Sequence, residues 1–453
     1  MSKYRSIVDQ LASRIRSGAL LPGSRLPAQR QLAAQLGVDL TTVTRAYTEL
    51  KRMGLVEGRS GSGSFVRGIP AAAEPVAATD GFDLSMNVPP RPPGLGDRVA
   101  EGLAALLAGP QGGASLGYQP SSGTARDRAA GASWLGRRLG AVAEDRMVVA
   151  AGAQSALFAL LDLLLDRGDT LACAGLTYPG MRAIAAHLGL RLAGLAQDAE
   201  GIDPDAFERL CRGEPPKALY LVPTIASPTT ATLPVERRRA IVAIARRHDV
   251  AIVEDDAYGA LPEAPPPPLA ALAPDVVWHV ASLSKCASPA LRVAYVAAPD
   301  AGAAVPLTAG LRAISLMVSP LTAALATRWI GDGTLATLTA AIRAENRARQ
   351  RLAASLLPAG AVAAHPDGNH LWLALPEGWS ATAFTAAARE SGLLVVPADA
   401  FDVTGAPPRA ERPPRAVRLS LGGVPDRAGL ERALRRLAGL LSWSAGAPGA
   451  AIV

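Results

Sequence analysis

The spacing of apolar residues predicts three short amphipathic helices in the first 54 residues. Apolar side chains recur at intervals of three and four over residues 7–15 and again over residues 27–36, and glycines at positions 18 and 37 follow the two runs. A glycine ends a helix readily because it adopts the left-handed conformation without strain. Asp39 stands where the N-cap of a third helix is expected.

The third helix has two distinct faces. The apolar face consists of Val43, Ala46, Tyr47 and Leu50. The opposite face is small, polar and cationic and consists of Thr41, Thr44, Arg45 and Thr48. Both sets follow the i, i+3, i+4, i+7 spacing of a helix. A short second helix, a tight turn and a third helix with a polar face are typical of a helix-turn-helix, whose last helix enters the major groove of DNA.

A hairpin is expected directly after these helices. Two short strand segments, Leu55–Gly58 and Ser64–Val66, flank the tip Arg59-Ser60-Gly61-Ser62-Gly63. The small residues of such a tip let its backbone approach DNA phosphates or the minor groove, and Arg59 adds a positive charge. The hairpin therefore has the character of a DNA-binding wing.

The rest of the chain alternates between strand-like and helical patterns. Residues 68–79 are rich in Ala and Pro and lack periodicity, which indicates a linker. Apolar strands separated by helices then predict an α/β domain with a mostly parallel sheet. Its expected strands are Met147–Ala150, Thr170–Cys173, Arg191–Leu195, Ala218–Val222, Val250–Val253, Val276–Ala281 and Val293–Ala297. From about Thr334 the pattern is that of a smaller α+β domain, with strands at Leu371–Leu375, Leu393–Val396 and Val417–Leu419 and a last helix from Pro425 to Leu441.

The charge of the chain is concentrated at one end. Residues 1–67 hold 11 Lys and Arg against 4 Asp and Glu, a difference of +7, whereas the remaining residues hold 35 of each sign. A basic head on a neutral body is typical of a nucleic-acid-binding domain. We find no membrane-spanning run and no secretion signal, so we expect a cytoplasmic protein. The three cysteines and five histidines show no metal-site spacing, and no metal is expected.

One lysine stands out in an arginine-rich chain. There are four lysines against 42 arginines, and Lys285 alone lies at the end of an apolar strand, within Ser282-Leu283-Ser284-Lys285. An amine can lose its proton and condense with a carbonyl group, which a guanidinium cannot do. Lys285 is therefore the candidate catalytic residue, and the cofactor that suits it is pyridoxal 5'-phosphate.

Other strand ends carry the groups that this cofactor needs. Asp255 can keep the pyridine nitrogen protonated, and Tyr258 can donate to the ring hydroxyl. Tyr178 can stack on the ring. A phosphate seat is expected where Gly152, Ala153 and Gln154 open a helix, because free backbone N–H groups meet the positive end of the helix dipole there. Arg292 and Ser282 are expected to complete the phosphate site, and Ser284 is a further candidate contact of the cofactor.

The first 67 residues resemble the GntR type of winged helix. The resemblance rests on Leu26-Pro27-Ala28-Gln29-Arg30-Gln31-Leu32-Ala33, on Thr41-Thr42-Val43-Thr44-Arg45-Ala46-Tyr47 and on Gly58 to Val66, in that order. It implies DNA contacts from Arg30, Thr41, Thr42, Thr44, Arg59, Gly61, Ser62 and Gly63. Arg45 joins this set because it lies on the polar helix face. Leu40 departs from the pattern, since many relatives carry a polar residue there.

Residues 82–441 resemble fold-type I pyridoxal-phosphate enzymes, in particular the aminoadipate and alanine aminotransferase group. The resemblance implies that Lys285 binds the cofactor covalently, that Asp255 contacts the pyridine nitrogen and Tyr258 the ring oxygen, and that Arg418 binds a substrate carboxylate. It also implies that Tyr118 reaches the phosphate of a partner subunit. Ser227 departs from the family, which usually has an asparagine there, and its shorter side chain puts efficient turnover in doubt.

Together the two resemblances match the MocR subgroup of GntR-type regulators. We expect a winged helix over residues 1–67, a linker over 68–81, a large cofactor domain over 82–333 and a small domain over 334–453. The function implied is a transcription regulator that senses pyridoxal phosphate, or an amine or amino acid condensing with it. Its implied partners are double-stranded operator DNA and a second copy arranged head to tail. The alternative is an active aminotransferase that carries a DNA-binding head.

Overall fold

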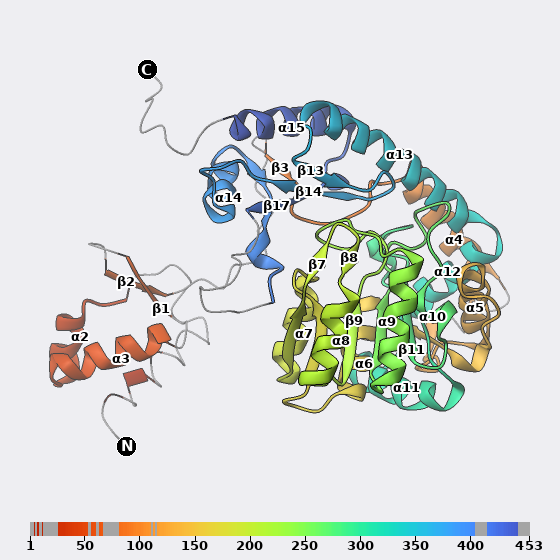
Figure 1. The fold of residues 1–453 in the computed structure, drawn as a ribbon, viewed down its shortest axis with the longest axis horizontal. Helices are drawn as coiled ribbons and strands as arrows, with labels where there is room; N and C mark the ends of the chain where they lie inside the picture. Colours follow the sequence, from red (N-terminus) through yellow and green to blue (C-terminus); the bar gives the residue numbers. More distant parts are fainter. Residues whose placement is uncertain are drawn as a thin grey trace. The chain divides into compact units, whose positions relative to one another are not determined.

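The computed structural model describes residues 26–52, 56–59, 63–66, 81–109, 112–113, 116–403 and 415–442, together with Tyr4, Ile7, Val8 and Leu11. The chain forms two compact units, Met1–Thr79 and Asp80–Val453 (Figure 1). The proposed linker, residues 68–81, lies outside the described residues except for Gly81. Among the described residues, no helix is both long enough and apolar enough to cross a membrane.

The N-terminal unit is a helix-turn-helix followed by a hairpin. Its elements are α2 (Gln29–Leu36), α3 (Leu40–Arg52), β1 (Val56–Arg59) and β2 (Gly63–Val66). The two strands are antiparallel, with Val56 opposite Val66. Ile7, Val8 and Leu11 are helical and buried, as expected for the first helix, whereas Ile15 and Gly18 lie outside the described residues. The predicted order of helices and hairpin is confirmed.

Local signals in the sequence explain the turn between α2 and α3. Gly37 ends α2 with φ +61°, a conformation that favours glycine. Asp39 caps α3, because its carboxylate accepts a hydrogen bond from the Thr41 backbone N–H at 2.7 Å. The apolar face of α3 is buried, and the Tyr47 hydroxyl donates to the Pro27 carbonyl oxygen at 2.8 Å. The predicted cap and buried face are both confirmed.

The large domain is built on a mostly parallel sheet, as predicted. Seven of its described strands form one sheet, and their order is β4 (Met147–Ala150), β12 (Ala294–Ala297), β11 (Val277–Ser282), β10 (Ala251–Asp255), β9 (Ala218–Leu221), β5 (Thr170–Ala174) and β6 (Arg191–Leu195). Strand β12 is antiparallel to both of its neighbours. The other strands run in one direction, so their carboxyl ends meet at one edge of the sheet.

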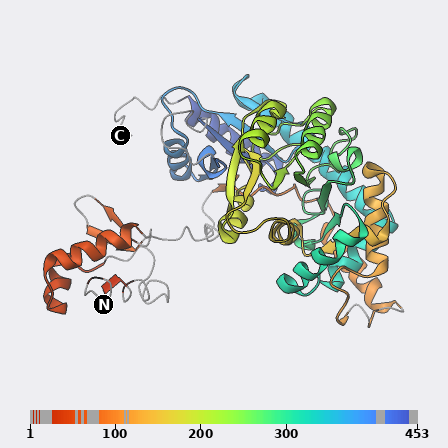
Figure 2. The ribbon, with the colours of Figure 1, turned by 60° about the horizontal axis from the view of Figure 1, so that its bottom comes forward.

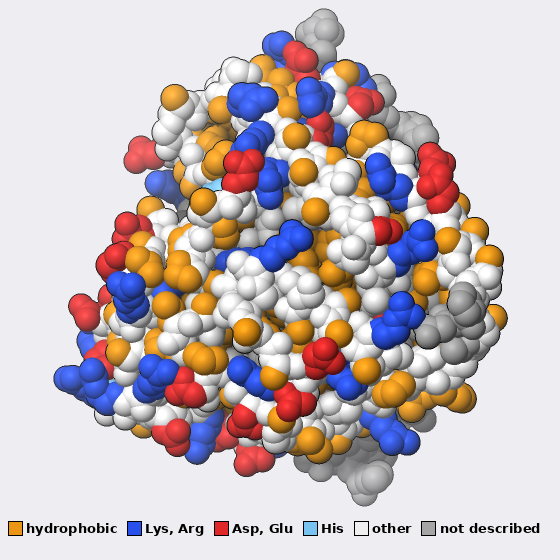
Figure 3. Space-filling model, turned by 90° about the vertical axis from the view of Figure 1, so that its right-hand side faces the viewer, with side chains coloured by type: hydrophobic (Ala, Val, Ile, Leu, Met, Phe, Trp, Pro, Cys, Tyr) orange, Lys and Arg blue, Asp and Glu red, His pale blue; other side chains and the backbone are white. Residues whose placement is uncertain are grey.

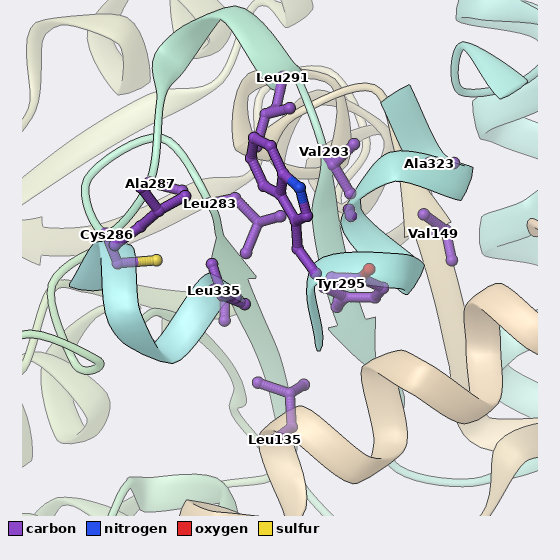
Figure 4. Packing of buried hydrophobic residues seen from close by; sticks show 14 of the residues in the cluster. Leu135, Val149, Leu283, Cys286, Ala287, Leu291, Val293, Tyr295, Ala323 and Leu335 are labelled. Carbon is purple, nitrogen blue, oxygen red and sulfur yellow. The ribbon is translucent and has the colours of Figure 1, made fainter. Parts of the chain in front are cut away.

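Helices cover both faces of this sheet. One face packs against α6 (Ala153–Leu164), α7 (Pro179–Leu188) and α11 (Ala301–Ser315). The other face packs against α5 (Ala125–Leu139), α8 (Pro204–Gly213), α9 (Val235–Arg247), α10 (Leu269–Leu272) and α12 (Pro320–Gly331). Figure 4 shows part of the hydrophobic core on this second face of the sheet. Val149 of β4 and Tyr295 of β12 belong to it together with Leu135 of α5. Burial on both faces explains why these strands are almost continuously apolar.

The small domain lies at one side of the large domain (Figures 1 and 2). Its main sheet has the order β13 (Val362–Ala364), β14 (His370–Ala374), β17 (Ala416–Ser420) and β16 (Val396–Pro397). It packs against α13 (Thr334–Leu356), α14 (Ala381–Glu390) and α15 (Arg427–Leu441). The other described elements of the C-terminal unit include α4 (Leu95–Ala108), the hairpin of β7 (Gln197–Asp198) and β8 (Gly201–Ile202), and 3₁₀ turns at Glu144–Arg146, Pro289–Leu291 and Ala398–Ala400.

One expected domain boundary needs correction. The large domain was expected to start at residue 82, but β3 (Phe82–Asp83) pairs with β15 (Leu393–Leu394) in parallel. Leu84 is buried in the core of the small domain. The chain therefore begins its C-terminal unit in the small domain and crosses afterwards to the large one. The spacing of apolar residues could not reveal this, because β3 finds its partner more than 300 residues away.

Two glycines of α5 provide a test of the core. A Cβ at Gly131 would overlap the ring of Tyr295, whereas one at Gly136 would have no heavy atom within 4 Å. We expect Gly131→Ala to lower the free energy of unfolding by about 1–3 kcal/mol through overpacking. Gly136→Ala, the matched control on the same helix, should raise it by about 0.5–1 kcal/mol. Chemical denaturation followed by circular dichroism checks both, and equal losses in the two variants would contradict this packing.

Candidate functional site

The carboxyl edge of the large sheet gathers the residues that the sequence singled out. Asp255 is the last residue of β10, Lys285 follows β11 and Gly152 follows β4. The carboxyl ends of these parallel strands share one edge, so residues more than 100 positions apart in the chain meet there. Ligands of open α/β sheets bind at this edge.

Lys285 has the properties of a reactive amine. Its Nζ atom donates a hydrogen bond to the main-chain oxygen of Asn87 and lies 5.9 Å from the centre of the Tyr258 ring. Burial lowers the pKa of Lys285 to about 8, and the positive charge of Arg418 acts in the same direction. A substantial fraction of the amine is therefore neutral at about pH 8, and the neutral amine is the form that attacks a carbonyl group.

Asp255 is a buried carboxylate, and one of its oxygens lacks a hydrogen-bond donor among the described residues. The Tyr220 hydroxyl donates to its Oδ2 atom at 2.9 Å, while Oδ1 has no partner among the described residues. Burial raises the pKa of Asp255 to about 6, although the hydrogen bond from Tyr220 opposes this rise. A buried acceptor without a donor is unfavourable, so Oδ1 fits a ligand that brings an N–H group.

Tyr258 is held beside Lys285 by two side chains. The Asn87 amide donates to the Tyr258 hydroxyl at 2.7 Å, and the Tyr258 and His370 rings are 5.5 Å apart. Burial raises the pKa of Tyr258, so the phenol is protonated at neutral pH. Burial lowers the pKa of His370 to about 3, so this ring is neutral. The hydroxyl proton of Tyr258 is consequently free to be donated to a bound group.

The start of α6 is a seat for an anion. Gly152 precedes the helix with φ +85°, and no side chain caps the first turn. A Cβ at Gly152 would lie 2.7 Å from Nη2 of Arg292, so only glycine lets this guanidinium approach the helix. Within the described part of the chain Arg292 has no hydrogen-bond partner. Free backbone N–H groups and an unpaired guanidinium together suit a phosphate.

Tyr178 is tied to the same helix. Its hydroxyl donates to the Gln154 side-chain oxygen at 3.1 Å, and 37% of the residue is exposed. A Cβ at Gly180 would overlap the Tyr178 ring, so this glycine makes room for it. The charges of Asp255, Arg292 and Arg418 all act on Tyr178, which places the ring among the other site residues.

Arg418 is a buried cation without a counter-ion. It lies on β17, is 7% exposed, and donates to the main-chain oxygen of Ser85. No carboxylate of the described residues forms an ion pair with it, and its Nε atom has no partner. Burial lowers the pKa of Arg418. Because a buried unpaired charge is costly, this guanidinium fits a ligand carboxylate.

The arrangement fits pyridoxal phosphate. The unpartnered oxygen of Asp255 suits the pyridine nitrogen, Tyr258 suits the ring oxygen, and the start of α6 with Arg292 suits the phosphate. Lys285 supplies the amine, and Tyr178 supplies an aromatic surface. The assignment of Asp255 rests on an oxygen atom that lacks a partner among the described residues. The roles of all these residues stay predictions.

Other expected residues are not joined to this cluster by hydrogen bonds. Tyr118 is 85% exposed and forms no hydrogen bond with these residues, as expected if it serves a partner subunit. Ser227 is buried beside a small separate space of about 30 Å³ that Thr177 also lines. Ser282 is buried and Ser284 half-buried, and neither side chain hydrogen-bonds to the described residues. Their roles stay predictions.

Two residues of the site were not expected from the sequence. Tyr220 lies on β9, opposite Val253 of β10, and therefore faces the same side of the sheet as Asp255 two residues further on. The period of two along the strands is a signal that could have found it. Asn87 lies outside any regular element, 171 residues before Tyr258, and no local pattern points to it.

The polar face of α3 is exposed in the N-terminal unit. Thr41, Thr44, Arg45 and Thr48 are exposed, as is Arg30 of α2, while Thr42 is half-buried. The Thr44 hydroxyl lies 2.8 Å from the Gln29 side-chain oxygen, and the Arg45 guanidinium lies 4.3 Å from the centre of the Tyr4 ring.

Two of the polar side chains of α3 are therefore held in place. In the hairpin, Arg59 and Gly63 belong to the strands. Gly61 and Ser62 lie outside the described residues, as does the side chain of Arg59.

Comparisons with known proteins cover both units. Residues 79–437 match the family model of aminotransferase class I and II, and residues 3–66 match that of bacterial regulatory proteins of the gntR family. The chain is 29% identical to the uncharacterized HTH-type transcriptional regulator YdeF of Bacillus subtilis (strain 168), over 97% of this chain and 94% of YdeF. It is 32% identical to the HTH-type transcriptional regulator TauR of Rhodobacter capsulatus, over 67% of this chain and 68% of TauR.

A solved structure resembles the C-terminal unit. LysN, the α-aminoadipate aminotransferase of Thermus thermophilus, superposes with a TM-score of 0.71 at 28% identity. The match covers 80% of this chain and 92% of LysN, which was crystallised with N-(5'-phosphopyridoxyl)-L-leucine. The fold of the C-terminal unit is thus that of a pyridoxal-phosphate aminotransferase.

The contact between Tyr220 and Asp255 yields a prediction about pH. Tyr220→Phe removes a hydrogen bond that favours the ionised carboxylate, so the pKa of Asp255 should rise above its value of about 6. The ionised form pairs with a protonated pyridine nitrogen, so affinity for pyridoxal phosphate should fall as the pH drops through this pKa. In the variant this fall should move to higher pH by about half a unit to one unit.

Titration of the protein with pyridoxal phosphate, followed by fluorescence from about pH 5 to pH 8, measures this shift. Tyr295→Phe is the matched control, because Tyr295 is another fully buried tyrosine of the same sheet and does not contact Asp255. The same pH midpoint in Tyr220→Phe and wild type would show that Tyr220 does not tune the carboxylate.

Proposed function

The chain belongs to the aminotransferase class I and II family and carries an N-terminal gntR-family domain, and on this basis we propose that it is a pyridoxal-phosphate-dependent regulator of transcription. Its two-domain order is the MocR-type architecture. The observation that carries the proposal is the presence, in one chain, of an exposed polar helix face in the N-terminal unit and a cluster of buried side chains that suits pyridoxal phosphate in the C-terminal unit. DNA is the partner that fits the first, and a small amine or amino acid fits the second.

Each group of the cofactor site has a defined task. Bound pyridoxal phosphate supplies an electrophilic carbon and withdraws electrons from an attached amine. Lys285 presents a partly neutral amine, and Asp255 holds negative charge at one end of the site. Tyr258 keeps a proton available at its hydroxyl. Arg292 and the first turn of α6 bind the phosphate and fix the orientation.

The effector class follows from Arg418. A buried guanidinium without a counter-ion selects a ligand with a carboxylate, and the reactive position beside Lys285 selects an amine. An amino acid carries both groups. Binding of such a ligand can change affinity for DNA only if it binds two arrangements of the protein with different affinity.

A second copy of the chain is part of the proposal. Large apolar side chains of the C-terminal unit that are at least 40% exposed include Met86, Leu107, Leu116, Tyr118, Ile314 and Leu316. Exposed apolar surface of this kind favours association. A head-to-tail dimer would cover it, would let Tyr118 reach the partner's phosphate, and would present two winged helices to two half-sites of an operator. Such a regulator acts in the cytoplasm, where bacterial DNA lies.

An active aminotransferase is the second candidate. It is favoured by Lys285, Asp255, Tyr258 and Arg418, which together retain the groups that transamination needs. Single-turnover absorbance measurements with a panel of amino acids separate the two functions. Conversion of the bound cofactor to its amine form would support catalysis, whereas no spectral change with any amino acid would count against it.

The cofactor assignment makes a direct prediction. Wild-type protein with pyridoxal phosphate should show a visible absorbance band that borohydride removes, and the reduced cofactor should stay on the protein after denaturation. Lys285→Ala should lack both properties because its side chain has no amine. Lys217→Ala is the control, since Lys217 lies before β9 and away from the site. An identical reducible band in Lys285→Ala would refute the assignment of this lysine.

The regulatory proposal predicts coupling between the two units. DNA selected by the protein from a random pool should bind with an affinity that changes at least about fivefold when pyridoxal phosphate, alone or with an effective amino acid, is added. Lys285→Ala should bind the same DNA without this response. Fluorescence anisotropy measures both. Equal affinity under every condition in wild type would count against a sensory role for the C-terminal unit.

A further inference from the structure

A second cavity lies in the large domain, on the side of the sheet that α5 covers. Its volume is about 680 Å³, within the range of sites for small molecules. Its walls come from the end of α5, from the loop of residues 256–268 and from the start of α13. Lys285, Asp255, Tyr258, Arg292 and Arg418 do not line it, but Ser282, an expected phosphate contact, and Asp256, the neighbour of Asp255, do. The cavity therefore adjoins the cofactor site without including the residues that carry its chemistry.

Three arginines line this cavity, two from α5 and one from α13. Arg138 binds Asp256 at 2.5 Å and the Pro266 carbonyl oxygen at 3.3 Å, and its side chain is 15% exposed. Arg343 donates to the Leu261 carbonyl oxygen, pairs with Glu263 at 3.4 Å and is 19% exposed. Both guanidiniums are thus anchored, and both keep part of their surface open. Arg137, which also lines the cavity, is exposed and has no partner among the described residues.

The backbone is shaped to allow this arrangement. A Cβ at Gly259 would overlap both Arg138 and Asp256, so glycine is required for Arg138 to reach its partner. The proline-rich part of this loop, Pro265 to Pro268, is held in place by Arg238, which is completely buried and donates to the Pro267 carbonyl oxygen. Arg238 also donates to the carbonyl oxygens of Pro223 and Leu233. The cavity is consequently built into the fold and does not need a ligand to form.

The other side chains that line the cavity are largely apolar. They include Trp134, Leu135, Ile330, Leu335, Ala336 and Ala340. The charged residues that line the cavity are Arg137, Arg138 and Arg343 against Asp256 and Glu263, a net charge of +1. Figure 3 views the side of the C-terminal unit that bears α5 and α12, and shows Lys and Arg side chains among apolar ones on this face.

We propose that this cavity is a second ligand site, for a small molecule with a carboxylate and an apolar or aromatic body. The guanidiniums of Arg137, Arg138 and Arg343 bind the carboxylate, since arginine presents paired N–H donors that match it. Trp134 and the leucines of α5 and α13 receive the body of the ligand. Binding at this site needs no reaction with Lys285.

Isothermal titration calorimetry with phenylacetate as the probe tests the site, and the uncharged phenylacetamide is its counterpart. The full-length chain carrying Arg418→Gln is used throughout, so that the carboxylate-binding residue of the cofactor site does not contribute. We expect one phenylacetate per chain and binding of phenylacetamide that is at least about tenfold weaker. Arg343→Gln should weaken phenylacetate by about tenfold, and Ala340→Phe should abolish binding by filling the cavity.

Arg347→Gln is the matched control. Arg347 lies one turn further along α13 and pairs with the same Glu263, but it does not line the cavity. It should leave the affinity unchanged. Thermal unfolding of each variant shows whether it is folded, and a folded Ala340→Phe that still binds phenylacetate would overturn the proposal. So would equal affinities for the acid and the amide.

The experiment is independent of the regulatory proposal. Lys285→Ala should bind phenylacetate as the parent chain does, whatever its response to pyridoxal phosphate. Loss of phenylacetate binding in Lys285→Ala would place the probe in the cofactor site and refute a second site. Failure of the cofactor to bind, with phenylacetate binding intact, would instead contradict only the proposed function.

Discussion

A buried carboxylate with one free oxygen is the constraint on which the cofactor site depends. Asp255 lies at the end of a central strand, and among the described residues only one of its oxygens has a partner, the Tyr220 hydroxyl. Burial makes the ionised form costly, and the amine of Lys285 offsets part of this cost. The site is therefore arranged to receive a positively charged or N–H-bearing ring, and its other residues lie around the place of that ring.

The end of strand β10 places acidic side chains on both faces of the sheet. Side chains alternate along a strand, so Asp255 points to the face of α6 while Glu254 and Asp256 point to the opposite face. The Glu254 carboxylate accepts hydrogen bonds from the backbone N–H groups of Leu269 and Ala270. It also forms a hydrogen bond with the His279 ring. Burial alone would raise the pKa of Glu254, but His279 and the two amides outweigh it and hold the pKa below its usual value.

The opposite face of β10 thus fixes the strand that presents Asp255, and through Asp256 it also forms a wall of the second cavity. A ligand in that cavity would lie beside Asp256, which directly follows Asp255 in the chain. The same short sequence, Glu254-Asp255-Asp256, therefore connects two sites on opposite faces of one sheet.

Local order in the sequence determined much of this protein. The helix-turn-helix follows from the caps at Gly37 and Asp39 and from the apolar face of α3, because these signals act within a few residues. The strands of the large domain are buried on both faces and are short apolar runs for that reason, so they too were predictable. Lys285, Asp255, Tyr258 and Gly152 could be singled out as candidates because each follows a predicted strand. Tertiary structure alone decided the rest. It brought Asn87 to Tyr258 across 171 residues, paired β3 with β15, set Tyr220 against Asp255 and enclosed the second cavity between α5 and α13. These features depend on contacts between distant segments, and no periodicity within a segment records which distant segment will lie beside it.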